Sequence, residues 1–227
     1  MGIQKKIRSL LHPVLKPVFQ WYLSKPRTYN FKNISVKVNP TVFHPGFFFS
    51  TKLLLKFLSG RQLKNKRILE LGAGTGLISL HCAKQGAIVT ATDISHPALQ
   101  NIKENAEINR VDITIIRSDL FANVSPNDFD IIIINPPYYP KKIETEKDYA
   151  WFCGENFEYF QRLFYEISKQ SDILSEILII LSEDCEISKI KAMAREQQLE
   201  LVMVHEKKIL GEWNYIFHLQ YMRSPVH

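Results

Sequence analysis

Acidic residues are absent from the first 69 residues of this 227-residue sequence. All 23 aspartates and glutamates lie from Glu70 onward, whereas 14 of the 29 lysines and arginines precede that position. The sequence therefore combines a basic N-terminal part with a remainder in which acidic residues outnumber basic ones. Such polarity is typical of a protein with a surface for nucleic acid or another anionic partner.

Cysteines and long apolar runs are also scarce. Cys82, Cys153 and Cys185 form no Cys-x-x-Cys pair, and the seven histidines show no metal-ligand spacing. This pattern argues against a disulfide framework and predicts buried free thiols, no metal site and a reducing, cytoplasmic environment. No apolar run approaches the roughly 20 residues that cross a bilayer, so we expect no integral membrane segment. The sequence does not indicate an oligomeric state.

The composition predicts one folded domain with a basic extension. The chain is 45% hydrophobic and 11% aromatic, which suffices for one sizeable core and falls short of two typical domains. We place the extension at residues 1–40 and the domain at residues 41–227. Apolar residues recur near helical spacing from Ile3 to Val14, and Trp21 follows among cations. Three interpretations stay open for this stretch: packing on the domain, contact with nucleic acid, or contact with a membrane surface.

Three alternate glycines follow a short apolar strand. Gly72, Gly74 and Gly76 lead into an apolar-periodic helix, a layout that brings a ligand close to the backbone at a helix N-terminus. A dinucleotide fingerprint requires Gly-x-Gly-x-x-Gly, but its third glycine position is Leu77 counted from Gly72 and Ser79 counted from Gly74. The loop therefore indicates an α/β ligand site and weakens the pyrophosphate interpretation.

Two further apolar runs end in an acidic residue. Residues 87–93 end at Asp93, and residues 113–119 end at Asp119. A carboxylate at the end of the second strand can hold two vicinal ribose hydroxyls. Each acid by itself is most often a strand-end or N-cap residue, but their order after the glycine loop predicts a nucleoside site.

The tetrapeptide 135–138, Asn-Pro-Pro-Tyr, follows the apolar run 129–134. Two consecutive prolines fix φ and hold the backbone extended, so the carbonyl of Pro136 cannot rotate away. A planar NH2 group can donate one hydrogen to the Asn135 side-chain oxygen and the other to this carbonyl, with Tyr138 stacked on its plane. The motif favours chemistry on an amide or amino nitrogen over a simple proline-rich turn.

Together these motifs resemble the class I S-adenosylmethionine-dependent methyltransferases. Within that class they are similar to the small-domain, HemK-like enzymes, which carry an Asn/Asp-Pro-Pro-Tyr/Phe motif and methylate amino nitrogens. The resemblance covers roughly residues 43–181. It implies a doubly wound, mostly parallel α/β sheet of seven strands with a Rossmann-like order, S-adenosylmethionine as the cofactor, and N-methyltransferase activity.

The resemblance also assigns roles to residues. The cofactor-binding residues that it implies are Glu70, Gly72, Gly74, Gly76, Asp93, Ile94, Asp119, Leu120 and Asn135. In this interpretation Asp93 binds the ribose hydroxyls, and Asp119 faces the adenine amine with Leu120 or Phe121 beside the ring. The catalytic residues that it implies are Asn135, Pro136, Pro137 and Tyr138. They would hold the amine while its nitrogen displaces the methyl group directly, without a strong base.

Further elements are expected after the motif. Strands are predicted at residues 176–181, 199–205 and 215–222, and a helix is predicted at residues 186–198. The last two strands would form a hairpin whose turn lies at residues 211–214. We interpret His44, a tempting base, as a loop or capping residue.

The methyl acceptor stays open at this stage. Residues 152–160 look like the segment that follows the motif in glutamine methyltransferases of peptide release factors, but only one glycine, Gly154, is present. Ribosomal RNA and transfer RNA methyltransferases share the same motif, so the partner is either RNA or a protein, with a small amine as a further alternative. A non-catalytic nucleotide-binding or RNA-binding module and a nucleotide-dependent oxidoreductase are the alternatives to this enzyme.

Overall fold

The structure, a computed structural model, describes residues 24–40, 42–47, 49–170 and 174–222. The strands are β1 (Arg27–Phe31), β2 (Ile34–Val38), β3 (Arg67–Leu71), β4 (Ile88–Asp93), β5 (Thr114–Arg117), β6 (Ile131–Ile134), β7 (Glu176–Ser182), β8 (Leu199–Ile209) and β9 (Glu212–Tyr221). The helices are α2 (Phe49–Ser59), α3 (Leu77–Lys84), α4 (His96–Asn109), α5 (Glu158–Ser168) and α6 (Ile187–Glu196). Short 3-10 helices are η1 (Pro45–Phe47), η2 (Pro126–Asp128) and η3 (Glu146–Ala150).

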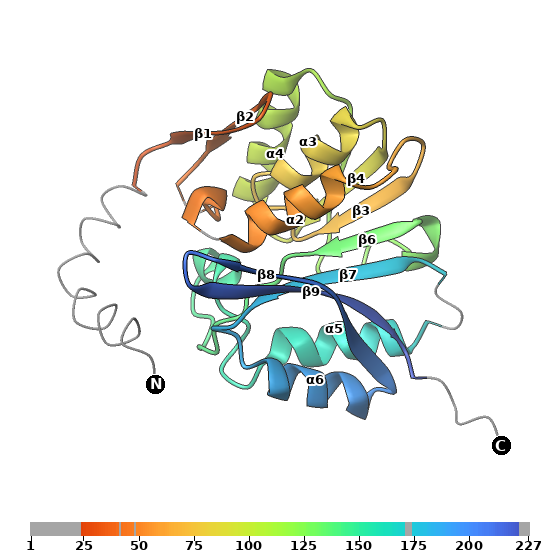
Figure 1. The fold of residues 1–227 in the computed structure, drawn as a ribbon. Helices are drawn as coiled ribbons and strands as arrows, with labels where there is room; N and C mark the ends of the chain where they lie inside the picture. The colour runs from red at the N-terminus through yellow and green to blue at the C-terminus, as the bar shows by residue number, and fades with distance from the viewer. Residues whose placement is uncertain (1–23, 41, 48, 171–173, 223–227) are drawn as a thin grey trace.

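Seven strands form one sheet in the order β5-β4-β3-β6-β7-β9-β8. Strands β3 to β7 pair in parallel, β9 pairs antiparallel with β7, and β8 pairs antiparallel with β9. Helices α2, α3 and α4 cover one face of the sheet, and α5 and α6 cover the other (Figure 1). This arrangement confirms the predicted doubly wound, mostly parallel sheet of seven strands.

Strand β6 shows why the sheet is apolar on both faces. Its four isoleucines are all buried. Ile131 and Ile133 pack in the cluster formed with α2 and α3, whereas Ile132 and Ile134 pack in the cluster formed with α5 and α6. Successive side chains of a strand point to opposite faces, so a central parallel strand covered by helices on both sides requires an uninterrupted apolar run.

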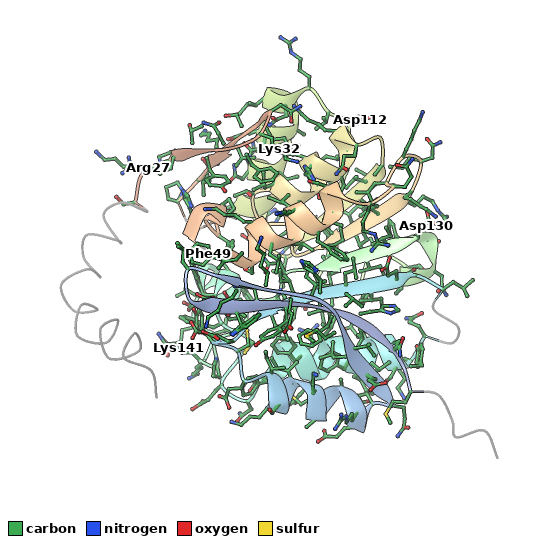
Figure 2. The ribbon with its side chains drawn as sticks, viewed as in Figure 1. Arg27, Lys32, Phe49, Asp112, Asp130 and Lys141 are labelled. Carbon is green, nitrogen blue, oxygen red and sulfur yellow. The ribbon has the colours of Figure 1, made fainter. Side chains whose placement is uncertain are left out.

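The two ends of β6 lie at opposite ends of the sheet. Asp130 immediately precedes β6, and Lys141 follows the Asn-Pro-Pro-Tyr motif at the other end of the strand. Asp130 and Lys141 lie on opposite sides of the molecule in Figure 2. Phe49, at the start of α2, lies on the side of Lys141. The motif and the start of α2 therefore belong to the same end of the molecule, where the parallel strands end.

The N-terminal strands form a separate antiparallel hairpin beside α4 (Figure 1). In β2 apolar and polar residues alternate, and Ile34, Val36 and Val38 are buried. Both strands lie within the predicted extension, and the boundary after residue 40 stays a prediction. Residues 1–23, for which the helical pattern was predicted, lie outside the described residues.

The C-terminal hairpin differs from its prediction in the position of the turn. The turn consists of Leu210 and Gly211, and residues 212–214 belong to β9. Leu210 has φ 47° and Gly211 has φ 91°, and positive φ at both central residues matches the twist of a two-residue hairpin. The predicted turn at residues 211–214 is therefore wrong, because β8 extends to Ile209.

The three cysteines are free and buried, as predicted. In the described part of the chain, no helix is long and apolar enough to cross a membrane.

Candidate active site

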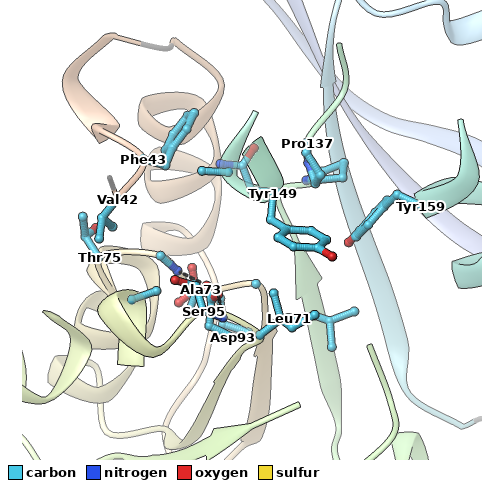
Figure 3. Close-up of a pocket in the computed structure, with 18 of the residues that line it drawn as sticks. Val42, Phe43, Leu71, Ala73, Thr75, Asp93, Ser95, Pro137, Tyr149 and Tyr159 are labelled. Atoms are coloured by element: carbon cyan, nitrogen blue, oxygen red, sulfur yellow. Dashed lines mark hydrogen bonds between the residues drawn. The ribbon is translucent and has the colours of Figure 1, made fainter. Parts of the chain in front are cut away.

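A cavity of about 300 Å³ opens where β3, β4, β5 and β6 end (Figure 3). The glycine loop and the residues that follow β4, β5 and β6 line one part of it. The residues before α2, the loop around η3 and the first turns of α5 line the rest. In open α/β sheets the crevice at the carboxyl ends of the strands is where ligands bind.

The glycine loop is tied to the end of β4 by a carboxylate. Asp93 accepts a hydrogen bond from the Gly74 N–H through Oδ2 and one from the Ser95 N–H through Oδ1, both at 2.9 Å. Gly74 has φ +55°, and a Cβ there would lie 3.9 Å from both Val42 and Phe43. The loop thus passes close under these two side chains in a conformation that glycine adopts most easily.

Glu70 is buried beneath the glycine loop. Its carboxylate accepts hydrogen bonds from the backbone N–H of Ser79, at 2.7 Å, and from the Ser79 hydroxyl. Ser79 lies in the first turn of α3, so the carboxylate binds one backbone N–H that the helix cannot satisfy itself. Burial raises the pKa of Glu70 to about 7, the two bonds from Ser79 oppose this shift, and the charge of Asp93 adds to it. Glu70 lines the cavity, and its binding to the cofactor stays a prediction.

Asp119 meets an arginine that the sequence analysis did not single out. Arg162, from α5, donates a hydrogen bond to Asp119 Oδ2 at 2.9 Å and lies 3.6 Å from Glu166. The bond with Asp119 raises the pKa of Arg162 above its usual range. Both Asp119 and Arg162 line the cavity. The two residues are 43 positions apart, and no local pattern in the sequence joins them.

The structure distinguishes between the two residues expected beside the adenine ring. Leu120 lines the cavity. Ile94, which directly follows Asp93 in the sequence, lines it as well. Phe121 is buried in the apolar cluster under α5, and its N–H donates to Glu166 Oε2 at 3.2 Å. Of the two residues only Leu120 belongs to the cavity lining, and its contact with the adenine ring stays a prediction.

Asn135 presents an unsatisfied acceptor at the cavity. Its Nδ2 donates a long hydrogen bond of 3.5 Å to Thr51 Oγ1. Its Oδ1 is buried and has no hydrogen-bond partner among the described residues. Pro136 and Pro137 line the cavity with it. A buried polar atom of this kind is rare in folded proteins, which points to a donor group supplied by a ligand.

Tyr138 lies beneath the motif, outside the cavity lining. Its side chain is 5% exposed and packs in the apolar cluster under α5. Its ring contacts that of Tyr139 with 4.9 Å between centroids, and its hydroxyl is hydrogen bonded with Ser182. Burial raises the pKa of Tyr138. The apolar core beneath the motif accepts the ring, and the predicted stacking of Tyr138 on a substrate amide stays a prediction.

Other aromatic side chains face the cavity. Tyr149, from η3, and Tyr159, from α5, direct their rings into it near Pro137 (Figure 3). Burial raises the pKa of Tyr159, and the charges of Asp93 and Asp119 add to the shift. Sequence reasoning missed both tyrosines: Tyr149 lies in a segment with no regular pattern, and the comparison of residues 152–160 gave Tyr159 no role.

The segment before α2 and the loop around η3 meet beside the cavity. Phe43, which lines the cavity, contacts Trp151 with 5.4 Å between ring centroids. His44 is buried and lies outside the cavity lining, and its Nδ1 accepts a hydrogen bond from the Gly46 N–H at 3.1 Å. Burial lowers the pKa of His44, and Arg27 contributes to the shift. The interpretation of His44 as a loop residue is confirmed.

The order of strands and the position of this cavity are those of the class I S-adenosylmethionine-dependent methyltransferases, in which S-adenosylmethionine supplies the methyl group. Residues 33–152 match the family described as the methyltransferase small domain, and the chain belongs to this family.

A relative from Methanocaldococcus jannaschii named "Putative protein N5-glutamine methyltransferase" is 35% identical over 195 residues, which are 80% of this chain and 96% of that protein. The release factor glutamine methyltransferase of Flavobacterium psychrophilum is 44% identical over 107 residues, which are 42% of this chain and 38% of that enzyme. The match therefore spans nearly the whole of the first relative and less than half of the second.

Solved structures show the same fold. A chain of the Encephalitozoon cuniculi Mtq2-Trm112 complex superposes with a TM-score of 0.60 at 22% identity, covering 80% of this chain and 99% of that one. A methyltransferase from Pyrococcus furiosus superposes with a TM-score of 0.63 at 18% identity, covering 93% of this chain and all of that one.

Proposed function

We propose that this methyltransferase acts on the side-chain amide nitrogen of a glutamine in a protein. The observation that carries the proposal is the buried Oδ1 of Asn135, which has no partner among the described residues and lies at the cavity where the methyl donor binds. An unpaired buried acceptor costs about 1–3 kcal/mol, and a substrate N–H would remove this cost.

A carboxamide fits the two acceptors of the motif. Its NH2 group has two hydrogens in one plane, one for Asn135 Oδ1 and one for the carbonyl of Pro136. The ring of Pro137 restricts the backbone at this carbonyl, so the acceptor is positioned before the substrate arrives. Tyr149 and Tyr159 supply aromatic surface at the cavity for the planar group.

The reaction is a direct displacement. S-adenosylmethionine, when bound, supplies a methyl group on a positively charged sulfur. Asn135 and Pro136 draw both amide hydrogens to one side and direct the nitrogen lone pair toward the methyl carbon. A nitrogen–carbon bond forms, the carbon–sulfur bond breaks and its electron pair stays on sulfur. The nitrogen then loses one proton to water.

The relatives support a protein glutamine as the acceptor. The Methanocaldococcus jannaschii relative, matched over 96% of its length, carries a name that specifies protein glutamine. RNA is a second candidate, favoured by the 14 cations that precede Glu70 without an intervening acid.

The decisive experiment transfers a labelled methyl group from S-adenosylmethionine to a release factor and, in parallel, to total RNA. Acid hydrolysis of an N-methylated glutamine releases labelled methylamine, whereas a methylated RNA base keeps its label. Protease-sensitive label that yields methylamine is expected. Nuclease-sensitive label without methylamine would contradict the proposal and establish the RNA candidate.

A glutamine-to-asparagine change at the methylated position of the release factor is the matched control. Both side chains carry an amide NH2 group, but the shorter one places it one methylene further from Asn135. Loss of labelling with this substrate would show that the enzyme recognises a glutamine at a defined position and does not methylate every exposed amide.

A further inference from the structure

Three asparagines on one face of α4 bind the N-terminal hairpin. Asn101, Asn105 and Asn109 are spaced by four residues, and residues with this spacing lie above one another on a helix. Their Oδ1 atoms accept the backbone N–H groups of Asn39, Lys37 and Ser35, at 3.1, 2.8 and 3.1 Å. Their Nδ2 groups donate to the carbonyls of Lys37, Lys37 and Ser35, at 2.8, 2.9 and 2.7 Å.

The match between helix and strand is geometric. Four residues of α-helix rise roughly 6 Å, and two residues of β-strand rise roughly 6.7 Å. Alternate residues of β2 point their N–H and C=O groups to the same edge, so every fourth residue of α4 meets every second residue of β2. The asparagines thus satisfy the edge of β2 that faces away from β1.

Asn105 also makes one hydrogen bond outside the hairpin, to the glycine loop. Its side chain is fully buried, and its Nδ2 also donates to the backbone carbonyl of Thr75 at 2.9 Å. Thr75 lies between Gly74 and Gly76 in the glycine loop and lines the cavity. The second amide hydrogen of Asn109 goes instead to the carbonyl of Asn105 within the helix, at 2.7 Å.

The hairpin leads directly to the opposite wall of the cavity. Strand β2 ends at Val38, and the Val42 N–H donates to the Asn39 carbonyl in the turn that follows, at 3.2 Å. Val42 and Phe43 then line the cavity over Gly74. One side chain, that of Asn105, therefore binds both the strand that sets this wall and the loop beneath it.

We infer that Asn105 is a positioning residue for the methyl donor. It fixes the wall of Val42 and Phe43 relative to the glycine loop, so that both sides of the donor pocket are held at the right distance before the donor binds. The inference rests on the assignment of this cavity as the donor site, and it is independent of the methyl acceptor.

The test compares Asn105→Ala with Asn109→Ala in the full chain. Each variant loses three hydrogen bonds on the same helix, but only the first loses the bond to Thr75. We expect both to lower the melting temperature. Calorimetry with S-adenosylhomocysteine should show about tenfold weaker binding for Asn105→Ala, as expected from the loss of one buried hydrogen bond, and near wild-type binding for Asn109→Ala.

Hydrogen exchange of the wild-type chain tests the same inference without a variant. Binding of S-adenosylhomocysteine should slow exchange of the Lys37 amide, which donates to Asn105, more than that of the Ser35 amide, which donates to Asn109. Equal affinities of the two variants, or equal protection of the two amides, would overturn the role of Asn105 alone. Absence of binding by the wild type would overturn the donor site as well.

Discussion

Gly74 donates its backbone N–H to Asp93 Oδ2 at 2.9 Å, so the glycine loop after β3 and the acid at the end of β4 form one unit. The two residues are 19 positions apart: Gly74 lies in the loop after β3, and Asp93 ends the neighbouring parallel strand β4. A donor molecule bound here meets a loop whose position depends on Asp93 as well as on the glycines.

The first prediction concerns this unit. Gly74→Val should abolish binding of S-adenosylhomocysteine, because φ +55° disfavours a β-branched residue and its side chain would enter the space below Val42 and Phe43. Asp93→Ala should weaken binding to a lesser degree, since it removes the acceptor for the Gly74 N–H. Calorimetry measures both. Unchanged affinity in two folded variants would show that the donor binds elsewhere.

The second prediction concerns Asn135. Asn135→Ala should lower kcat by about 10²–10³-fold, the usual effect of removing one preorganised hydrogen-bonding group, while donor affinity stays near that of the wild type. Asn123→Ala is the control, because that asparagine lies outside the cavity and its side chain donates a hydrogen bond to the backbone carbonyl of Arg117. Full activity of Asn135→Ala would show that the Asn-Pro-Pro-Tyr motif only forms a turn and has no role in catalysis.

The third prediction separates Tyr138 from Tyr159. Tyr138→Phe removes a buried hydroxyl that is hydrogen bonded with Ser182, so it should lower the free energy of unfolding by about 1 kcal/mol and leave kcat nearly unchanged. Tyr159→Ala removes a ring that faces the cavity and should raise KM or lower kcat. Urea unfolding and steady-state kinetics on both variants measure the difference. A large loss of kcat in Tyr138→Phe would show that the buried hydroxyl acts in catalysis.

The fourth prediction concerns pH. The pKa of Glu70 is raised from 4.5 to about 7 by burial, so between these values the folded chain holds a proton that the unfolded chain has lost. The free energy of unfolding should therefore fall as the pH rises from 4.5 to 7, by up to a few kcal/mol from this group.

Thermal unfolding of Glu70→Gln tests this pH dependence. Glutamine keeps a side-chain oxygen for the Ser79 N–H but does not titrate, so the decline should become shallower. Glu107→Gln, at an exposed position of α4, should keep the wild-type profile. Identical profiles for Glu70→Gln and the wild type would contradict the assignment of the decline to Glu70.

The fifth prediction concerns the basic N-terminal residues. Removal of residues 1–23 takes away four cations and leaves β1, which begins at Arg27, intact. If these residues contact RNA, the logarithmic salt slope of RNA binding should fall by up to about 3, since each phosphate contact contributes about 0.7 for a single strand. Filter binding measures the slope, and sedimentation with anionic vesicles tests the membrane interpretation. If the truncated chain melts at a lower temperature but binds RNA and vesicles as the full chain does, residues 1–23 pack on the domain.

The local sequence by itself predicted the central strands and the residues at their carboxyl ends, whereas the seven-stranded sheet was implied by the family resemblance. Apolar runs of four to seven residues, each followed by glycines, an acid or a proline motif, predicted β3 to β6 and placed Gly74, Asp93 and Asn135 at one edge. This works because the period of a strand and the signals that end it are local, and because parallel strands bring their carboxyl ends to the same edge.

Only the tertiary structure decided which side chains meet at that edge. The bond from Asn105 to Lys37 spans 68 positions and the bond from Arg162 to Asp119 spans 43, and neither has a local pattern. The ring of Tyr138 is buried because the core formed by α5 and the sheet receives it, while Tyr159 faces the cavity. Such contacts depend on how helices pack on the sheet, and that packing is set by many distant side chains at once.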